Sequence, residues 1–207
     1  MKRTERPSAR ERNRRSILDA AQAVLREDPE ASLDDVAARA GVVRRTVYGH
    51  FTSRADLVVA LVRAAAADFI AQVGDVDPDS GDPAAEFAAT ILRTWSTSRR
   101  YGPVILLARR TVDDEVRAAM APFATIMVRL LENGQRAGVF ARHVAAPVLA
   151  EVLQAGSATY LRAAQAGRWD GGEADVALGH LLTLGVPLDD ARAAVARAGA
   201  ARPDVLT

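Results

Sequence analysis

Five side chains with hydrogen-bonding groups lie close together in the sequence: Arg44, Arg45, Thr46, Tyr48 and His50. An arginine guanidinium can donate two parallel hydrogen bonds to O6 and N7 of guanine, and a threonine can contact a base edge or a thymine methyl group. Tyrosine and histidine can donate to phosphate oxygens, which position a protein on DNA without reading its sequence. The chemistry that this group could perform is therefore recognition of a nucleic acid.

Two short helices must position these side chains. Ser32 and Asp35 form an S-x-x-D capping signature at the start of the first helix. Gly41 follows the last periodic residue, where a left-handed conformation suits a residue without Cβ. The inward face of the first helix is predicted to hold Leu33, Val36, Ala37 and Ala40. A second helix is predicted over about residues 43–51, with Val43 and Val47 directed inward.

Helix, glycine-containing turn and helix make up the helix-turn-helix motif, whose second helix enters the DNA major groove. The alternative is a structural helical hairpin with a solvated basic face, because helix-turn-helix patterns are short and degenerate. We expect Arg44, Arg45 and Thr46 to contact base edges. We expect phosphate contacts from Tyr48, His50, Thr52 and Arg54, assisted by N-terminal arginines, among them Arg10 and Arg14.

The same stretch resembles the DNA-binding domain of the tetracycline-repressor (TetR) family. The resemblance is carried by Ala40-Gly41-Val42, Thr46-Val47-Tyr48-Gly49-His50-Phe51, Ser53-Arg54 and Leu57. It is tight over about residues 10–62 and concerns only architecture and length beyond them. It implies a dimer that binds a palindromic operator and responds to a small-molecule effector. One departure is Val43, because the family usually has a small hydroxyl residue or Gly there, and Val lacks an oxygen with which to cap the helix.

Charge is unevenly distributed along the chain. Residues 1–15 carry seven Lys and Arg against two Glu, a net charge of +5, whereas residues 61–207 carry 15 basic and 17 acidic residues, a net charge of −2. Alone, a basic N-terminus is most simply a solvated tail. Next to a helix-turn-helix it is a candidate arm for DNA phosphates or the minor groove.

Composition favours an all-α protein. The 207 residues are 49% hydrophobic, with few Gly and Pro inside the long segments and no strand-like alternation. We expect nine or ten helices: a three-helix helix-turn-helix domain in residues 1–60 and an effector-binding and dimerisation bundle in residues 61–207. The chain has no Cys and no apolar run long enough to span a membrane, so we expect a cytoplasmic protein that does not contact membranes.

Catalytic and metal-binding patterns are absent from the sequence. The adjacent acidic residues at 113–115 and 189–190 fall in the first turns of predicted helices, where the helix dipole favours them. The three His residues lack metal-ligand spacing, and no nucleophile or phosphate-loop motif occurs. We therefore expect neither an enzyme nor a cofactor.

Large flexible and aromatic side chains concentrate on two neighbouring predicted helices of the bundle. The candidate ligand-binding residues are Trp95, Tyr101, Met120, Phe123 and Met127. Apolar pockets between helices are common small-molecule sites, although ordinary core packing explains the same periodicity. The TetR resemblance favours a ligand, and Arg93, Arg99 and Arg109 are candidates to meet an anionic group.

Small residues in two later helices suggest a dimer seam. Ala155-Gly156-Ser157-Ala158 would let another helix approach closely, although burial within one subunit is the alternative. The resemblance implies a four-helix interface, and we expect it to contain Val148, Val152, Ala155, Thr159, Leu178, Leu181 and Leu182.

These observations predict a ligand-responsive transcriptional repressor that binds a palindromic double-stranded operator as a homodimer. A transcriptional activator on the same fold is an alternative. A helical ligand-binding or interaction protein that has lost DNA binding is a second alternative, favoured by Val43 at the cap position.

Overall fold

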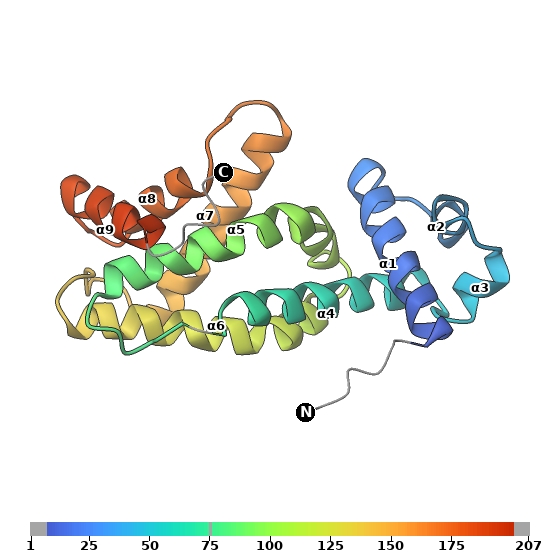
Figure 1. Cartoon of the computed structure of the whole chain (residues 1–207), viewed down its shortest axis with the longest axis horizontal. Coiled ribbons are helices and arrows are strands. Elements are labelled where there is room, and N and C mark those ends of the chain that lie inside the picture. The colour runs from blue at the N-terminus through green and yellow to red at the C-terminus, as the bar shows by residue number, and fades with distance from the viewer. Residues whose placement is uncertain (1–7, 75, 201–207) are drawn as a thin grey trace. The chain divides into compact units, whose positions relative to one another are not determined.

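The computed structural model describes residues 8–74 and 76–200, and all regular secondary structure within them is helical (Figure 1). This confirms the all-α fold and the expected number of helices. In chain order the helices are α1 (Ala9–Glu27), α2 (Leu33–Ala40), α3 (Arg44–Tyr48), α4 (Arg54–Gln72), α5 (Pro83–Ala108), α6 (Asp113–Arg136), α7 (Ala146–Gln165), α8 (Glu173–Thr183) and α9 (Leu188–Ala200).

The chain divides into two compact units. The first, called the N-terminal unit, consists of the chain up to Ala65 together with Pro103–Ala119, and the second, called the bundle unit, consists of Ala66–Gly102 and the chain from Met120 onward. Helices α4, α5 and α6 therefore each contribute residues to both units.

Local sequence signals explain how the first helices of the N-terminal unit begin and end. Ser8 and Glu11 form a complete capping box at the start of α1, and Ser32 and Asp35 form another at the start of α2. Gly41 ends α2 with a φ of 66°, the left-handed conformation that its lack of Cβ permits. Helices α1 and α2 pack together, as do α2 and α3.

Helix α3 is shorter than the sequence predicted. It ends at Tyr48, and Gly49 and His50 form a turn in which the His50 and Phe51 amides both donate to the Val47 carbonyl. Val47 is fully buried and Phe51 nearly so. The prediction that Val43 points inward is wrong: its side chain is 64% exposed.

The bundle unit has an aromatic and aliphatic core. Phe87 of α5 packs edge-on against Phe140, their ring centroids 6.0 Å apart, with Leu130 and Leu181 fully buried in the same cluster. Helix α5 continues through Pro103, which lacks the amide hydrogen that an interior helical residue donates. None of the helices in the described part of the chain combines the length and apolar composition that a membrane span requires.

Candidate nucleic-acid interface and ligand cleft

Helix α3 presents its polar side chains because Val47 fixes its buried face. Arg44, Arg45 and Tyr48 are exposed, whereas Thr46 is half-buried. The helix-turn-helix geometry therefore places two guanidinium groups at the surface at the beginning of α3, as the spacing predicted.

Arg44 is held by an acidic residue of the preceding helix. Its Nη1 lies 3.0 Å from Oδ2 of Asp34 in the first turn of α2, and the Arg44 side chain remains 74% exposed. This ion pair restricts the guanidinium without burying it. Exposed pairs of this kind contribute little to stability, so the arginine stays available to another partner.

His50 lies near the basic start of α1. Burial is the main cause that lowers the pKa of His50, and the positive charges of Arg10 and Arg14 lower it further. The guanidinium carbon of Arg14 also lies 5.3 Å from the centroid of the Phe51 ring. The structure thus brings Arg10 and Arg14 close to the end of α3. The basic residues at positions 2, 3 and 6 lie outside the described residues.

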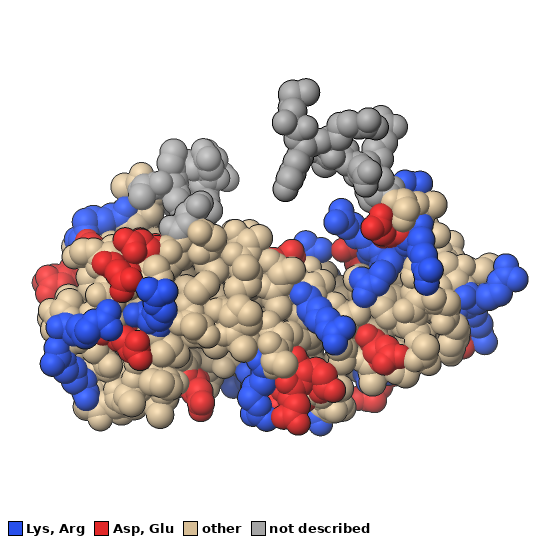
Figure 2. All heavy atoms as spheres, turned by 90° about the horizontal axis from the view of Figure 1, so that it is seen from below, with Lys and Arg blue, Asp and Glu red and all other residues tan. Residues whose placement is uncertain are grey.

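Two predicted phosphate-binding side chains make hydrogen bonds within the protein. The Thr52 hydroxyl donates to the Asp56 carboxylate. Arg54 donates from Nε to the Ala31 carbonyl at 3.1 Å and from Nη2 to the Pro29 carbonyl. A phosphate contact by either residue would compete with these bonds, and this tertiary role of Arg54 had no signal in the sequence. On the face seen in Figure 2, basic side chains are interspersed with acidic ones.

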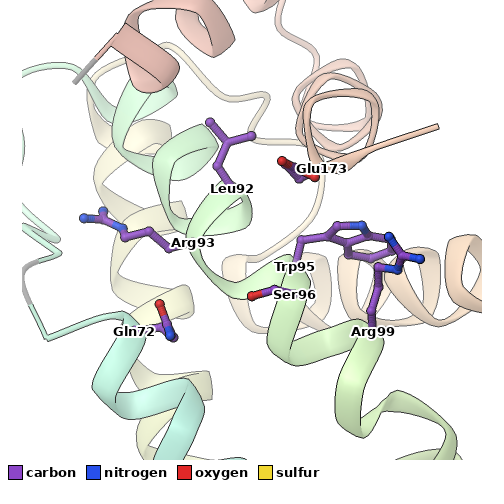
Figure 3. A pocket seen from close by; sticks show the side chains of 7 residues that line it. All are labelled: Gln72, Leu92, Arg93, Trp95, Ser96, Arg99 and Glu173. Carbon is purple, nitrogen blue, oxygen red and sulfur yellow. The ribbon is translucent and has the colours of Figure 1, made fainter. Parts of the chain in front are cut away.

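The bundle unit contains a cleft with a volume of about 290 Å³ (Figure 3). Its lining comes from three helices: the end of α4, the middle of α5 and the first residue of α8. The lining residues are Gln72, Leu92, Arg93, Trp95, Ser96, Arg99 and Glu173. The cleft therefore combines one large aromatic side chain with a mostly polar lining, whereas typical small-molecule pockets are mostly apolar.

Of the five predicted ligand-binding residues, Trp95 lines this cleft and the other four are not among its lining residues. The Tyr101 hydroxyl donates to Asp68 at 2.8 Å. Phe123 contacts Phe69, with ring centroids 5.1 Å apart, and Met120 and Met127 are buried. Periodicity identified these side chains as inward-facing but could not separate a cleft wall from packed core.

Polar groups around the cleft are only partly satisfied. Arg93 pairs with Glu86 at 3.0 Å, but its Nε is buried and has no hydrogen-bond partner in the described part of the chain. The same holds for Nε1 of Trp95, whose ring packs edge-on against Trp169 at 6.3 Å. Leu92, Ser96, Gln72 and Glu173 were missed from the sequence because isolated residues on helix surfaces carry no distinguishing pattern.

An apolar surface lies on α7 and α8. Val148 and Val152 are 51% and 47% exposed, and Leu182 is 42% exposed. Among the other predicted interface residues, Ala155 and Thr159 are also exposed, and Leu178 is half-buried. Leu181, by contrast, is fully buried in the core of its own unit. Most of the predicted interface residues thus lie at the surface of the bundle unit, whereas Leu181 belongs to its core.

The described residues contain no group of three or more His, Cys, Asp or Glu side chains placed to hold a metal ion. The described residues instead offer three separate candidate sites. These are the exposed hydrogen-bond donors of α3, the cleft around Trp95, and the exposed apolar face of α7 and α8.

Comparison with known proteins shows what the helix-turn-helix part of the chain is similar to. The family model described as bacterial regulatory proteins, tetR family, matches residues 17–61, which contain the helix-turn-helix. The HTH-type transcriptional repressor LfrR of Mycolicibacterium smegmatis is 42% identical over 98 residues, which amount to 47% of this chain and 50% of that repressor. The match therefore spans only half of the relative's length.

Solved structures extend the likeness along the chain. The crystal structure of the TetR-like transcriptional regulator LfrR from Mycobacterium smegmatis in complex with proflavine has a TM-score of 0.69 and 28% identity, covering 86% of this chain and 97% of that one. The regulator FadR from Bacillus subtilis in complex with stearoyl-CoA has a TM-score of 0.68 and 15% identity, covering 82% and 96%, and shows the fold alone. Residues 17–61 thus match the tetR family of bacterial regulatory proteins, and the fold of the chain is similar to that of the TetR-like regulator LfrR.

Proposed function

We propose that this protein is a ligand-responsive transcriptional repressor that binds a palindromic DNA operator as a homodimer. The observation that carries the proposal is the pair of exposed guanidinium groups, Arg44 and Arg45, on a helix anchored by the buried Val47 within a family-matched helix-turn-helix. Residues 1–60 would form the DNA-binding domain, and residues 61–207 the effector-binding and dimerisation domain.

Each half of the dimer would read one half-site. Arg44, Arg45 and Thr46 contact base edges in the major groove, while Tyr48 and His50 contact phosphates, with support from Arg10 and Arg14. Thr52 and Arg54 contact phosphates as well only if they give up their hydrogen bonds to Asp56 and to the Ala31 and Pro29 carbonyls. The recognition helices of the two subunits enter successive major grooves about 34 Å apart.

The exposed apolar face of α7 and α8 supports dimerisation. Val148, Val152 and Leu182 account for half of the large hydrophobic side chains that are exposed in the described residues. A two-fold axis beside these helices would bury the same residues from both subunits. Covering such side chains removes apolar surface from water and stabilises association.

The cleft around Trp95 is the proposed effector site. The regulators LfrR and FadR were solved with proflavine and stearoyl-CoA respectively. In this cleft the Trp95 ring offers an aromatic contact, and the polar side chains beside it offer hydrogen bonds to a small molecule. Helix α4 contributes Leu57 to the core of the N-terminal unit and Phe69 to the bundle unit. A ligand that favours one conformation of the bundle would shift the position of α4 and the affinity for DNA.

Selection from a randomised duplex pool tests this proposal. The full-length protein should enrich a palindrome, and the Arg44→Ala variant should lose that enrichment. Arg39→Ala is the matched control, because Arg39 is an exposed arginine of α2 that pairs with Glu27 at 3.4 Å, outside the recognition helix. Failure to enrich any sequence would refute the proposal.

A ligand-binding protein that has lost DNA binding is the second candidate. The observation that favours it is the absence of a side-chain cap at Val43. Salt-independent binding to mixed DNA, or no binding, would support this candidate, because phosphate contacts make the affinity fall with salt. A transcriptional activator with the same site would bind the same operator, and a reporter gene downstream of it distinguishes activation from repression.

A further inference from the structure

Val43 is an apolar side chain at the surface of the proposed DNA interface. It is 64% exposed, whereas Val47, the same residue type one helical turn away, is fully buried. Val43 and Tyr48 are the exposed large hydrophobic side chains recorded within the described residues of the N-terminal unit. The core of this unit therefore does not account for the presence of a valine at this position.

Helix stability does not account for Val43 either. Ser, Thr, Asp and Asn are preferred where a helix begins because their side chains accept hydrogen bonds from free backbone amides. Ser8 and Ser32 do so for α1 and α2, but the start of α3 has no side-chain cap bond. Residues that depart from such local preferences without a gain in packing are found mainly at functional positions, so the departure at Val43 points to a function.

The neighbours of Val43 indicate what it would contact. Arg44 follows directly, exposed and paired with Asp34 at 3.0 Å, and is the residue proposed to read a guanine. The isopropyl group of Val43 has no hydrogen-bond donor or acceptor, so it gains nothing from a phosphate oxygen. Among the base-edge groups of the major groove, the apolar one is the C5-methyl group of thymine.

We propose that Val43 is a specificity-determining residue that packs against the C5-methyl group of a thymine next to the guanine read by Arg44. This inference rests on the proposed function, since it requires DNA in contact with α3. It assigns a recognition role to a residue that lacks polar chemistry, and it predicts a thymine in each half-site whose methyl group matters for affinity.

Deoxyuridine substitution tests this contact, because deoxyuridine differs from thymidine only by lacking the C5-methyl group. Each thymine of the selected operator is replaced in turn in both half-sites, and affinity for the full-length dimer is measured by fluorescence anisotropy. Removing the contacted methyl should weaken binding about fourfold per half-site, the loss expected for one buried methyl group. The same replacement should leave the affinity of Val43→Ala unchanged.

The Val43→Ser variant separates recognition from folding. Serine supplies the missing cap, so its urea midpoint should rise, while its affinity for the thymine-containing operator should fall and its sensitivity to deoxyuridine should disappear. If no thymine responds in the wild-type protein, or if Val43→Ala responds equally, the inference is overturned and the proposed function stands. If no operator is enriched at all, both are overturned.

Discussion

Replacing Arg54 with Ala should destabilise the N-terminal unit. Arg54 reaches from the first residue of α4 to the loop between α1 and α2, where Nε donates to the Ala31 carbonyl at 3.1 Å and Nη2 donates to the Pro29 carbonyl. The guanidinium therefore connects the start of α4 to the loop between α1 and α2 through two main-chain oxygens.

The expected loss follows from the burial of the two acceptors. Ala31 is buried, so its carbonyl would lose a charged donor with little access to water, which costs about 1–3 kcal/mol. Pro29 is exposed, so its carbonyl can bond to water instead and contributes little. We expect Arg54→Ala to lower the free energy of unfolding by about 2 kcal/mol, and Arg54→Lys to lower it by less.

Urea denaturation followed by circular dichroism measures this change at neutral pH. Arg39→Ala is the control, because its partner Glu27 lies 3.4 Å away at the surface and such pairs contribute less than about 1 kcal/mol. DNA binding is then compared at a temperature at which both proteins are folded. An unchanged unfolding free energy, with a salt dependence reduced by about one phosphate contact, would refute the structural role and establish Arg54 as a phosphate ligand.

Three further predictions concern the bundle unit. Gly134→Ala should destabilise the fold by about 1–3 kcal/mol in urea denaturation, because a Cβ would overlap the buried Phe140 ring, whereas Gly199→Ala meets open space and should be neutral or stabilising. Burial lowers the pKa of His180 to about 4. Its contribution to stability is therefore complete above its unfolded pKa near 6.5 and is lost as the pH falls towards 4. The free energy of unfolding should fall by about 2 kcal/mol between neutral pH and pH 5 for this reason, and urea denaturation of His180→Gln should not show this fall. Val152→Asp should weaken the proposed dimer at least about tenfold in sedimentation, since it places a charge in the proposed apolar interface; an unchanged dimer would exclude the α7 surface from that interface.

Local signals allowed the sequence to predict the helix-turn-helix. Ser8, Ser32 and Gly41 lie at helix ends and act on amides or dihedral angles a few residues away, so their roles follow from spacing alone. The inward position of Val47 follows from the spacing of apolar residues along a helix. Val43 was misassigned because the prediction placed it inside the second helix, four residues before Val47. In the structure Val43 is the N-cap of α3 and has an extended backbone, to which helical periodicity does not apply.

Tertiary contacts could not be predicted in this way. Arg54 bonds to carbonyls more than 20 residues earlier, and no sequence pattern links these positions. The cleft joins Gln72 to Glu173 across about half of the chain. Helix α5 continues through Pro103, although local rules disfavour a proline inside a helix.

The proposed recognition of an operator depends on one central claim, which is that Arg44 reads a base. The most direct measurement is the affinity of wild-type protein and Arg44→Ala for the selected operator and for a variant with one guanine per half-site replaced. We expect the wild-type protein to discriminate between the two duplexes by about 1–3 kcal/mol and Arg44→Ala not to discriminate between them. Equal weakening of Arg44→Ala on both duplexes, with the discrimination intact, would contradict it and make Arg44 a phosphate contact.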